Sequence, residues 1–168
     1  MQRVGKVDYF DGTKRKLYFF VEKEVEPIAE EIDQKDEIPK EIIKKMGELG
    51  FYGLSYPEKY GGQEQDTITQ CICVEELARG SLAVAAVAGM FAMAPSAIYH
   101  LGTEAQKQKY LPPTWRGEKF PCLGLTEPNA GSDLSMISTT ARREGDEYVI
   151  NGSKIFTSFG NIADYIVL

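Results

Sequence analysis

The polar residues of this chain do not assemble into a catalytic set of familiar spacing. His100 is the single histidine, so any nucleophile–histidine pair would have to be built on it. A histidine at the expected C-terminal end of a helix is better explained by its favourable interaction with the helix dipole. The pairs Glu30/Glu31 and Glu75/Glu76 are adjacent in sequence, and adjacent helix positions diverge by about 100°. We therefore interpret both pairs as solvent-facing carboxylates rather than as an acid and a base.

The cysteines do not indicate a metal site or a disulfide framework. There are three of them, Cys71, Cys73 and Cys122, which is too few and an odd number for a set of disulfides. Their spacing relative to the histidine does not match a zinc site. Cys71 and Cys73 are two positions apart on an expected helix, so their side chains diverge by about 200° and cannot hold one ion together. The sequence predicts reduced thiols and no metal.

The segment with most chemical content is Leu123-Gly-Leu-Thr-Glu-Pro-Asn-Ala-Gly-Ser-Asp133. It reads as a strand followed by a sharp turn rich in Pro, Asn and Gly, which presents hydroxyl groups and consecutive backbone N–H groups. Turns of this kind form anion-binding concavities. On residue chemistry alone, the segment could hold a phosphate or the polar edge of a ring, or it could be an ordinary β-bend.

Two helices are expected near the N-terminus, upstream of this segment. Apolar residues recur at steps of three and four from Leu17 to Ile32, which is the stripe of an amphipathic helix. Pro27 lies inside that stripe and predicts a kink or a break. Pro39 favours the start of a second helix, which carries Ile42, Ile43, Met46 and Leu49 and which Gly50 ends.

Three more helices are expected to follow. Asp66 can cap a third helix, which carries Ile68, Cys71, Ile72, Glu75 and Ala78. Ser81 can cap a fourth, and Thr103 with Gln106 forms a capping box for a fifth that ends near Trp115. The fourth helix has no charged residue from Leu82 to Tyr99. Because it is rich in alanine and contains a proline, we interpret it as the buried centre of a helix bundle and predict no membrane span.

The pattern changes to strands after Gly117. Residues 139–144 and 145–152 predict two strands joined by a Glu-Gly-Asp-Glu turn. Asn151-Gly152 predicts a further tight turn, followed by β-prone stretches at Ile155–Thr157 and Tyr165–Leu168. The fold class is therefore α+β: an all-α helical bundle over residues 1–120, then the first strands of an antiparallel, β-barrel-like middle domain over residues 121–168. Leu168 closes an apolar run without a turn or a polar tail, so we expect this β domain to be truncated.

Composition excludes several classes of protein. The chain is 43% apolar and 26% charged, which is typical of soluble globular proteins. Its net charge is −6 and its basic residues are not clustered, so nucleic-acid binding is not indicated. Arg3 and Lys6 are not followed by an apolar run, so we expect no secretory signal. A cytoplasmic location follows as the expectation.

Several sequence motifs of the chain resemble those of one known family. LGLTEPNAGSD, followed by Gly145-Asp, Asn151-Gly-Ser-Lys154 and Ile155-Phe-Thr-Ser158, resembles the signature of the acyl-CoA dehydrogenases, with the same internal distances. Upstream, Pro57-Glu-Lys-Tyr-Gly-Gly62 and Gly102-Thr-Glu-Ala-Gln-Lys-Gln-Lys-Tyr-Leu-Pro112 are similar to that family's helical domain in the same order. The resemblance covers the chain from about residue 17.

The resemblance implies FAD as the cofactor and a set of residues that contact it. By position in the motifs, Thr126 meets the pyrimidine side of the flavin, while Ser132 reaches both FAD and a bound acyl-CoA. Phe156 stands where the family usually has a tryptophan stacked on the ring, and Ser158 where it has a threonine that bonds the flavin N5. Phe159 replaces a common asparagine, which leaves the subfamily and the substrate open. The implied cofactor-binding set is Leu123, Leu125, Thr126, Ser132, Phe156, Thr157 and Ser158, with Ser132 also contacting substrate.

The resemblance also implies a reaction, the α,β-dehydrogenation of an acyl-CoA in fatty acid metabolism. In this family a glutamate removes the α-proton and the β-hydride passes to flavin N5. That glutamate is expected beyond Leu168, so these 168 residues are expected to contain no catalytic residue and to be inactive alone. Glu127 is not that base, and we interpret it as a carboxylate that bonds turn amides.

Partners follow from the same resemblance. An electron-transfer flavoprotein is the expected electron acceptor, and a homotetramer or homodimer is the expected assembly of the full-length protein. The location would be the mitochondrial matrix in a eukaryote, although no transit peptide is evident. Two alternatives stay open: an acyl-CoA oxidase or flavin monooxygenase of the same fold, and a non-catalytic subunit that pairs with a larger partner. The second gains support because a truncated β domain exposes an unpaired strand edge.

Overall fold

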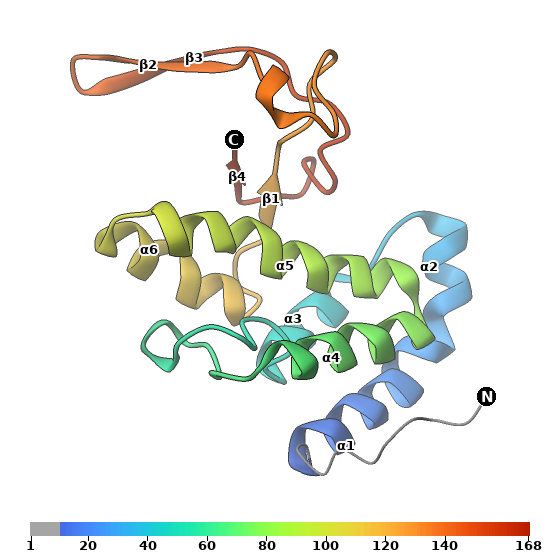
Figure 1. The fold of residues 1–168 in the computed structure, drawn as a ribbon. Coiled ribbons are helices and arrows are strands. Elements are labelled where there is room, and N and C mark those ends of the chain that lie inside the picture. Colours follow the sequence, from blue (N-terminus) through green and yellow to red (C-terminus); the bar gives the residue numbers. More distant parts are fainter. Residues whose placement is uncertain (1–10) are drawn as a thin grey trace. The chain divides into compact units, whose positions relative to one another are not determined.

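The computed structural model describes residues 11–168, which form two compact units (Figure 1). The first extends to Lys119 and is helical, and the second is Phe120–Leu168 and contains the strands. The expectation drawn from Arg3 and Lys6 lies outside the described residues. A helical unit followed by a few strands of an unclosed sheet confirms the predicted fold class.

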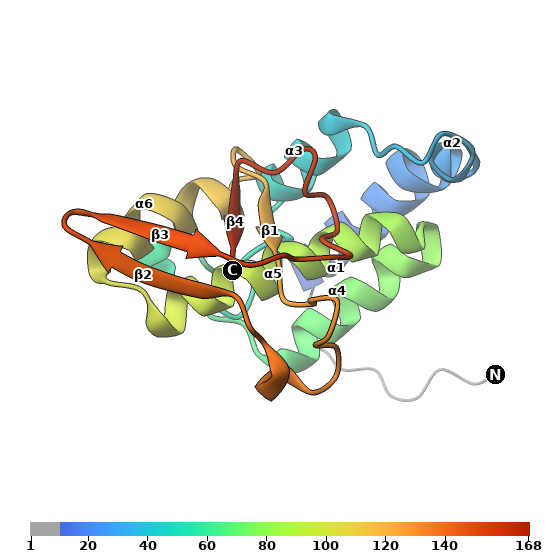
Figure 2. The same cartoon turned by 90° about the horizontal axis from the view of Figure 1, so that it is seen from above.

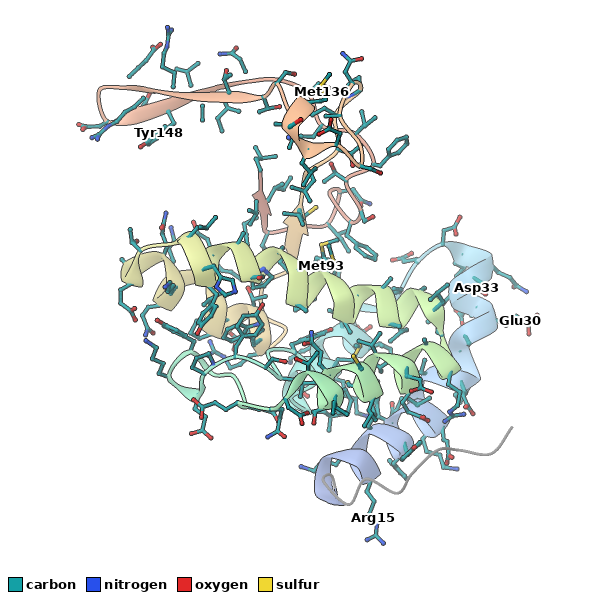
Figure 3. The ribbon with its side chains drawn as sticks, viewed as in Figure 1. Arg15, Glu30, Asp33, Met93, Met136 and Tyr148 are labelled. Carbon is teal, nitrogen blue, oxygen red and sulfur yellow. The ribbon has the colours of Figure 1, made fainter. Side chains whose placement is uncertain are left out.

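Pro27 divides the first helical stretch, as its position predicts. Helix α1 (Asp11–Phe20) continues into a π-helical turn (Val21–Val25) and a 3-10 turn (Glu26–Ile28), and α2 (Ala29–Lys35) follows. Proline has no N–H to donate to the preceding turn, so the regular α-helical ladder cannot pass through it. The predicted apolar stripe is confirmed, because Leu17, Val21, Val25 and Ile32 are buried. Glu30 projects from α2 on its exposed side (Figure 3).

Helix α3 (Lys40–Glu48) begins after Pro39 and buries Ile42, Ile43 and Met46. The chain turns at Gly50, whose φ is +78°, a conformation that glycine adopts at little cost. The loop that follows contains a 3-10 turn (Glu58–Tyr60). This loop is ordered by its own aromatic residues, since Phe51, Tyr52 and Tyr60 are at most 4% exposed.

Helix α4 (Thr67–Gly80) begins as predicted, because the Asp66 carboxylate accepts a hydrogen bond from the Thr69 N–H at 2.8 Å. The buried residues of this helix are Thr69, Cys73, Glu76 and Leu77, whereas Ile68, Cys71 and Glu75 are exposed. The interpretation of Glu76 as a solvent-facing carboxylate is therefore wrong. Glu76 can be buried because the Arg79 Nε donates to its Oε1 at 2.6 Å, which supplies the partner that a buried charge needs.

Helices α5 (Leu82–Leu101) and α6 (Glu104–Trp115) complete the helical unit. Both predicted caps are confirmed. The Ser81 hydroxyl accepts from the Val84 N–H, and Thr103 and Gln106 form a capping box in which each satisfies a backbone N–H of the other. Helix α5 runs beside α4 (Figures 1 and 2) and also contacts α6. His100 lies in the last turn of α5, where the sequence placed it.

Helix α5 is the one helix within residues 11–168 that is long and apolar enough to cross a membrane, although the core helix of a soluble protein passes the same test. Only 39% of its most apolar stretch is buried. Leu82 is 77% exposed and Met93 is 56% exposed (Figure 3). The prediction of a helix buried on all sides is therefore wrong for one face, because α4 and α6 cover only part of it.

The β unit contains two separate two-stranded sheets. Strands β2 (Thr140–Glu144) and β3 (Glu147–Asn151) form the predicted antiparallel hairpin, with Gly145 at a φ of +65° in its turn. Every residue of the two strands is exposed, and Tyr148 is 65% exposed (Figure 3). Neither face of the hairpin is covered by other residues of the β unit.

The second sheet corrects the expected pairing. Strand β1 (Pro121–Leu123) pairs with β4 (Tyr165–Val167) in parallel (Figure 2), so the expectation of antiparallel pairing is wrong here. Ile155–Thr157 was also wrongly predicted as a strand. Its Ile155 N–H bonds the Thr126 carbonyl in a single contact, which is too little to make a strand ladder.

Candidate functional site

Six of the seven predicted site residues lie on two segments that run beside each other, residues 122–127 and 154–158. The Ile155 N–H donates to the Thr126 carbonyl at 2.9 Å. At the other end, the buried Cys122 thiol donates to the Ser158 carbonyl at 3.0 Å. Burial raises the pKa of this thiol, so it stays protonated and able to donate. These bonds bring Leu123, Leu125 and Thr126 together with Phe156, Thr157 and Ser158.

Phe156 has an unusual conformation for an aromatic residue. Its φ is +55° and its side chain is 87% exposed. A left-handed backbone is uncommon for residues other than glycine, and such conformations persist where surrounding contacts enforce them, often at functional sites. Leu125 is also exposed, by 38%. An aromatic face and an apolar side chain are thus left uncovered by the rest of the β unit.

The arrangement fits a flat ring with one polar edge. Phe156 and Leu125 offer apolar surface, while Thr126 and Ser158 place hydroxyl groups on the same two segments. Phe159 is the second left-handed residue here, at a φ of +62°, and it packs against Phe120 with ring centroids 5.3 Å apart. Its side chain therefore serves packing within the β unit. On this observation, the residues present suit a flavin.

Ser132 stands apart from the two segments. It lies in the exposed loop before the 3-10 turn Leu134–Met136. Asp133 orders this loop, because its carboxylate accepts from the Ser135 N–H at 3.0 Å and from the Ser135 hydroxyl at 2.6 Å. These two bonds lower the pKa of Asp133. The role of Ser132 stays a prediction from the family motif.

The buried carboxylate of Glu127 links the two segments to residues 138 and 139. Its side chain is 2% exposed, and one carboxylate oxygen accepts from both the N–H and the hydroxyl of Ser138, each at 2.8 Å. The other oxygen accepts from the Thr139 N–H at 3.0 Å and from the Lys154 ammonium at 2.8 Å. The interpretation of Glu127 as a carboxylate that bonds turn amides is confirmed. The Lys154 bond above all, and then the bonds from residues 138 and 139, hold its pKa far below the ordinary value.

Lys154 is the residue that sequence reasoning missed. It appears in the Asn-Gly-Ser-Lys string, but its side chain was given no role. Its Nζ bonds Glu127 and also the Leu125 carbonyl at 3.1 Å. The sequence feature that indicates this role is the position of Lys154 directly before the apolar pair Ile155-Phe156. A lysine that is buried beside apolar residues needs a charged or polar partner.

We predict that Glu127 gives the β unit a pH-dependent stability. Because its folded pKa lies below the ordinary 4.5, the stabilisation is fully present above about pH 4.5 and is lost as the pH falls through the lowered value. Protection of the Ser138 and Thr139 amides from hydrogen exchange should therefore exceed that of Glu127→Gln at about pH 6. The difference should narrow as the pH falls below about 4.5, and it should close only near the lowered pKa of Glu127. A difference that stayed constant over this range would contradict the prediction.

A groove in the helical unit is unrelated to these residues. It has a volume of about 360 Å³ and lies between α2 and α3, lined by Ile28, Glu31, Ile32, Lys35, Glu37, Pro39, Lys40 and Glu41. None of the predicted site residues lines it. Its lining carries charges of both signs. Among the described residues, no group of three or more His, Cys, Asp or Glu side chains could hold a metal ion.

The family of the chain is shown by comparison with family models. The model of the acyl-CoA dehydrogenase N-terminal domain matches residues 14–118, and that of the acyl-CoA dehydrogenase middle domain matches residues 122–168. Together they account for nearly the whole chain. The chain belongs to the acyl-CoA dehydrogenase family, whose cofactor is FAD.

Individual relatives support the same assignment. The chain is 44% identical over 154 residues to a 3-(aryl)acrylate reductase of Clostridium sporogenes. It is 48% identical over 151 residues to a short-chain specific acyl-CoA dehydrogenase of Clostridium acetobutylicum. Each alignment covers 89% of this chain and 40% of the relative. The chain therefore spans about two fifths of the length of these relatives.

A solved structure gives the same result for the fold. A glutaryl-CoA dehydrogenase from Mycobacterium smegmatis, in complex with FADH2, matches with a TM-score of 0.88 and 28% sequence identity. The match covers 96% of this chain and 42% of that one. The helical unit and the strands described above are thus also found, in the same order, in a protein that holds reduced FAD.

Proposed function

We propose that this chain is the flavin-contacting part of an FAD-dependent acyl-CoA dehydrogenase that acts on the α,β bond of an acyl-CoA thioester. The observation that carries the proposal is the side-by-side arrangement of residues 122–127 and 154–158, in a chain that matches both domain models. That arrangement gathers an exposed aromatic face and two hydroxyl groups on adjacent segments. Family membership supplies the identity of the ring that they suit.

FAD, when bound, supplies the acceptor for a hydride. The residues of this chain bind and orient it: Phe156 and Leu125 pack on the ring, and Thr126 and Ser158 donate hydrogen bonds to its polar edge. Donors that are fixed before the reaction stabilise developing negative charge without reorganising, which is the main electrostatic source of catalysis. Ser132 contacts the substrate. The smaller area of Phe156, compared with the usual tryptophan, leaves the ring less covered.

The base that removes the α-proton is proposed to lie outside these 168 residues. The carboxylate within residues 122–127 and 154–158 is that of Glu127. It already accepts four hydrogen bonds from Ser138, Thr139 and Lys154. A lowered pKa also makes it a weak proton acceptor. We propose that the glutamate base of the family serves here, carried by the rest of the protein.

A second candidate is the reverse reaction, reduction of an α,β-unsaturated acyl thioester or acid. It is favoured by one observation, the 44% identity to a protein named 3-(aryl)acrylate reductase. Both directions use the same bond and the same flavin. An electron-transfer flavoprotein as redox partner, assembly as a homotetramer or homodimer, and a cytoplasmic location complete the proposal.

The test uses the natural full-length protein that carries these residues. We expect it to purify with the visible absorption of oxidised flavin, and anaerobic butyryl-CoA should bleach that absorption. Crotonyl-CoA added to the dithionite-reduced protein should restore it if the enzyme also runs as a reductase. Turnover that consumes oxygen and releases hydrogen peroxide would indicate an oxidase instead. A protein with no flavin, even after addition of FAD, would point to the non-catalytic subunit and would sink the proposal.

A further inference from the structure

One ion pair in the β unit differs from every other ion pair of the described residues. In Lys154–Glu127 both side chains are largely buried, 12% and 2% exposed. The other pairs each include a side chain that is at least 38% exposed, such as Lys35–Glu31 at 65% and 60%. Exposed pairs contribute little to stability because water and salt screen them. A buried pair is different, since removing one partner leaves an uncompensated charge out of water.

The atoms that Lys154 contacts lie on both sides of Thr126. Its Nζ bonds the Leu125 carbonyl at 3.1 Å and the Glu127 carboxylate at 2.8 Å. The next N–H along the chain, that of Ile155, bonds the Thr126 carbonyl itself. Three consecutive residues, 125 to 127, are thus fixed by two consecutive residues, 154 and 155. The backbone of Thr126 cannot shift without breaking at least one of these bonds.

The same lysine lies two residues before Phe156. The left-handed backbone of Phe156 must be enforced by its neighbours. On one side this is done by the bonds of Lys154 and Ile155, and on the other by the Cys122 thiol on the Ser158 carbonyl. Glu127 extends the network to residues 138 and 139. Gly152 allows its own segment to lie close to Thr139, since a Cβ on Gly152 would be 2.7 Å from the Thr139 Cα.

We propose that Lys154 is a positioning residue, whose ammonium, held by Glu127, sets the position of Thr126 relative to Phe156 and so places the donors and the aromatic face against the flavin. This inference rests on the proposed function. Lys154 acts through residues 125 to 127, because its ammonium bonds the Leu125 carbonyl and the Glu127 carboxylate. Its charge is neutralised by Glu127, so its effect is one of geometry. Small displacements matter in such a site, because a misplacement of about 1 Å can cost about 100-fold in rate.

The test compares four forms of the full-length flavoprotein: wild type, Lys154→Met, Lys154→Arg and the control Lys35→Met. Methionine keeps the apolar stem and removes the charge, whereas arginine keeps a charged donor. The readouts are the visible circular dichroism of the bound flavin and the single-turnover rate of its reduction by butyryl-CoA. The FAD dissociation constant and the thermal unfolding midpoint are measured on the same samples. Lys35 forms the exposed pair with Glu31 and is matched in charge and length.

We expect Lys154→Met to change the flavin circular dichroism and to slow reduction about 100-fold at saturating FAD. Lys154→Arg should recover to within about tenfold, and Lys35→Met should match wild type. A Lys154→Met protein with a lower unfolding midpoint but unchanged dichroism and rate would overturn the proposal, because the pair would then serve stability alone. If Lys154→Met does not fold, the double variant Glu127→Gln/Lys154→Met removes both charges and faces the same criteria. Absence of flavin in wild type would instead refute the proposed function, and this inference with it.

Discussion

Replacing Phe91 by alanine is expected to destabilise the helical unit by about 3–5 kcal/mol. Phe91 is fully buried on α5 and stacks on Tyr52, with ring centroids 3.8 Å apart. The Tyr52 hydroxyl in turn donates to the Ile43 carbonyl of α3 at 3.0 Å. Truncation at Phe91 would therefore leave a cavity where α5 meets the loop after α3. Urea unfolding followed by the fluorescence of Trp115, the single tryptophan, would measure the change.

The matched control is Phe19→Ala on α1. Phe19 is 63% exposed, so the same substitution removes little buried surface and should change the free energy of unfolding by less than about 1 kcal/mol. Trp115 is a suitable probe because it is 2% exposed and stacks on Tyr56 at 4.6 Å. Equal effects of the two substitutions would show that Phe91 is not the packing centre that its burial indicates.

The ends of the helices could be predicted because the responsible groups are local. Asp66, Ser81 and Thr103 each bond an N–H within three residues, so a short window of sequence contains both partners. Pro27 acts on its own turn in the same way. Which face of a helix is buried is not local. On α4, Glu76 is buried and Ile68 exposed, an outcome decided by Arg79 and by neighbouring helices rather than by the hydrophobicity of the helix itself.

The strands show the same limit. The β2–β3 hairpin was predictable because its turn, centred on Gly145, and its two strands are contiguous. The pairing of β1 with β4 joins residues more than 40 positions apart, Pro121 with Tyr165, and propensity contains no information on its direction. Ile155–Thr157 has β-prone residues but forms no strand within the described structure, since its backbone serves Thr126 instead.

In the candidate site, too, the residues could be predicted from the sequence but the contacts between distant segments could not. Its seven candidate residues were predicted by resemblance to family motifs, and six of them lie on two adjoining segments. The bonds that hold these segments were not visible in the motifs, because Lys154 contacts residues 27 and 29 positions away and Cys122 contacts one 36 positions away. A motif records which residues recur, whereas the contacts that fix them depend on how distant segments pack.

Two glycine-to-alanine substitutions in helices are expected to have opposite effects on stability. In α3, a Cβ on Gly47 would lie 2.4–2.5 Å from backbone atoms of Arg116 and Gly117. Backbone cannot rotate away as a side chain can, so Gly47→Ala must push α3 from the end of α6. We expect a net destabilisation of about 1–3 kcal/mol or more, despite the better helix propensity of alanine. In α5, a Cβ on Gly89 would meet no described atom within 4 Å apart from its chain neighbours and the adjacent backbone of its own helix, so Gly89→Ala should stabilise by about 0.5–1 kcal/mol.

Urea unfolding of the two variants beside wild type measures both effects in one experiment. The substitution is chemically the same at both positions, and each removes the same conformational freedom from the unfolded chain. The difference in sign therefore reports only the space around each glycine in the folded protein. Stabilisation by Gly47→Ala would mean that α3 and the residues after α6 do not approach backbone to backbone. The same approach involves Gly117, whose φ is +72° and on which a Cβ would lie 3.1 Å from the Ile43 carbonyl oxygen of α3.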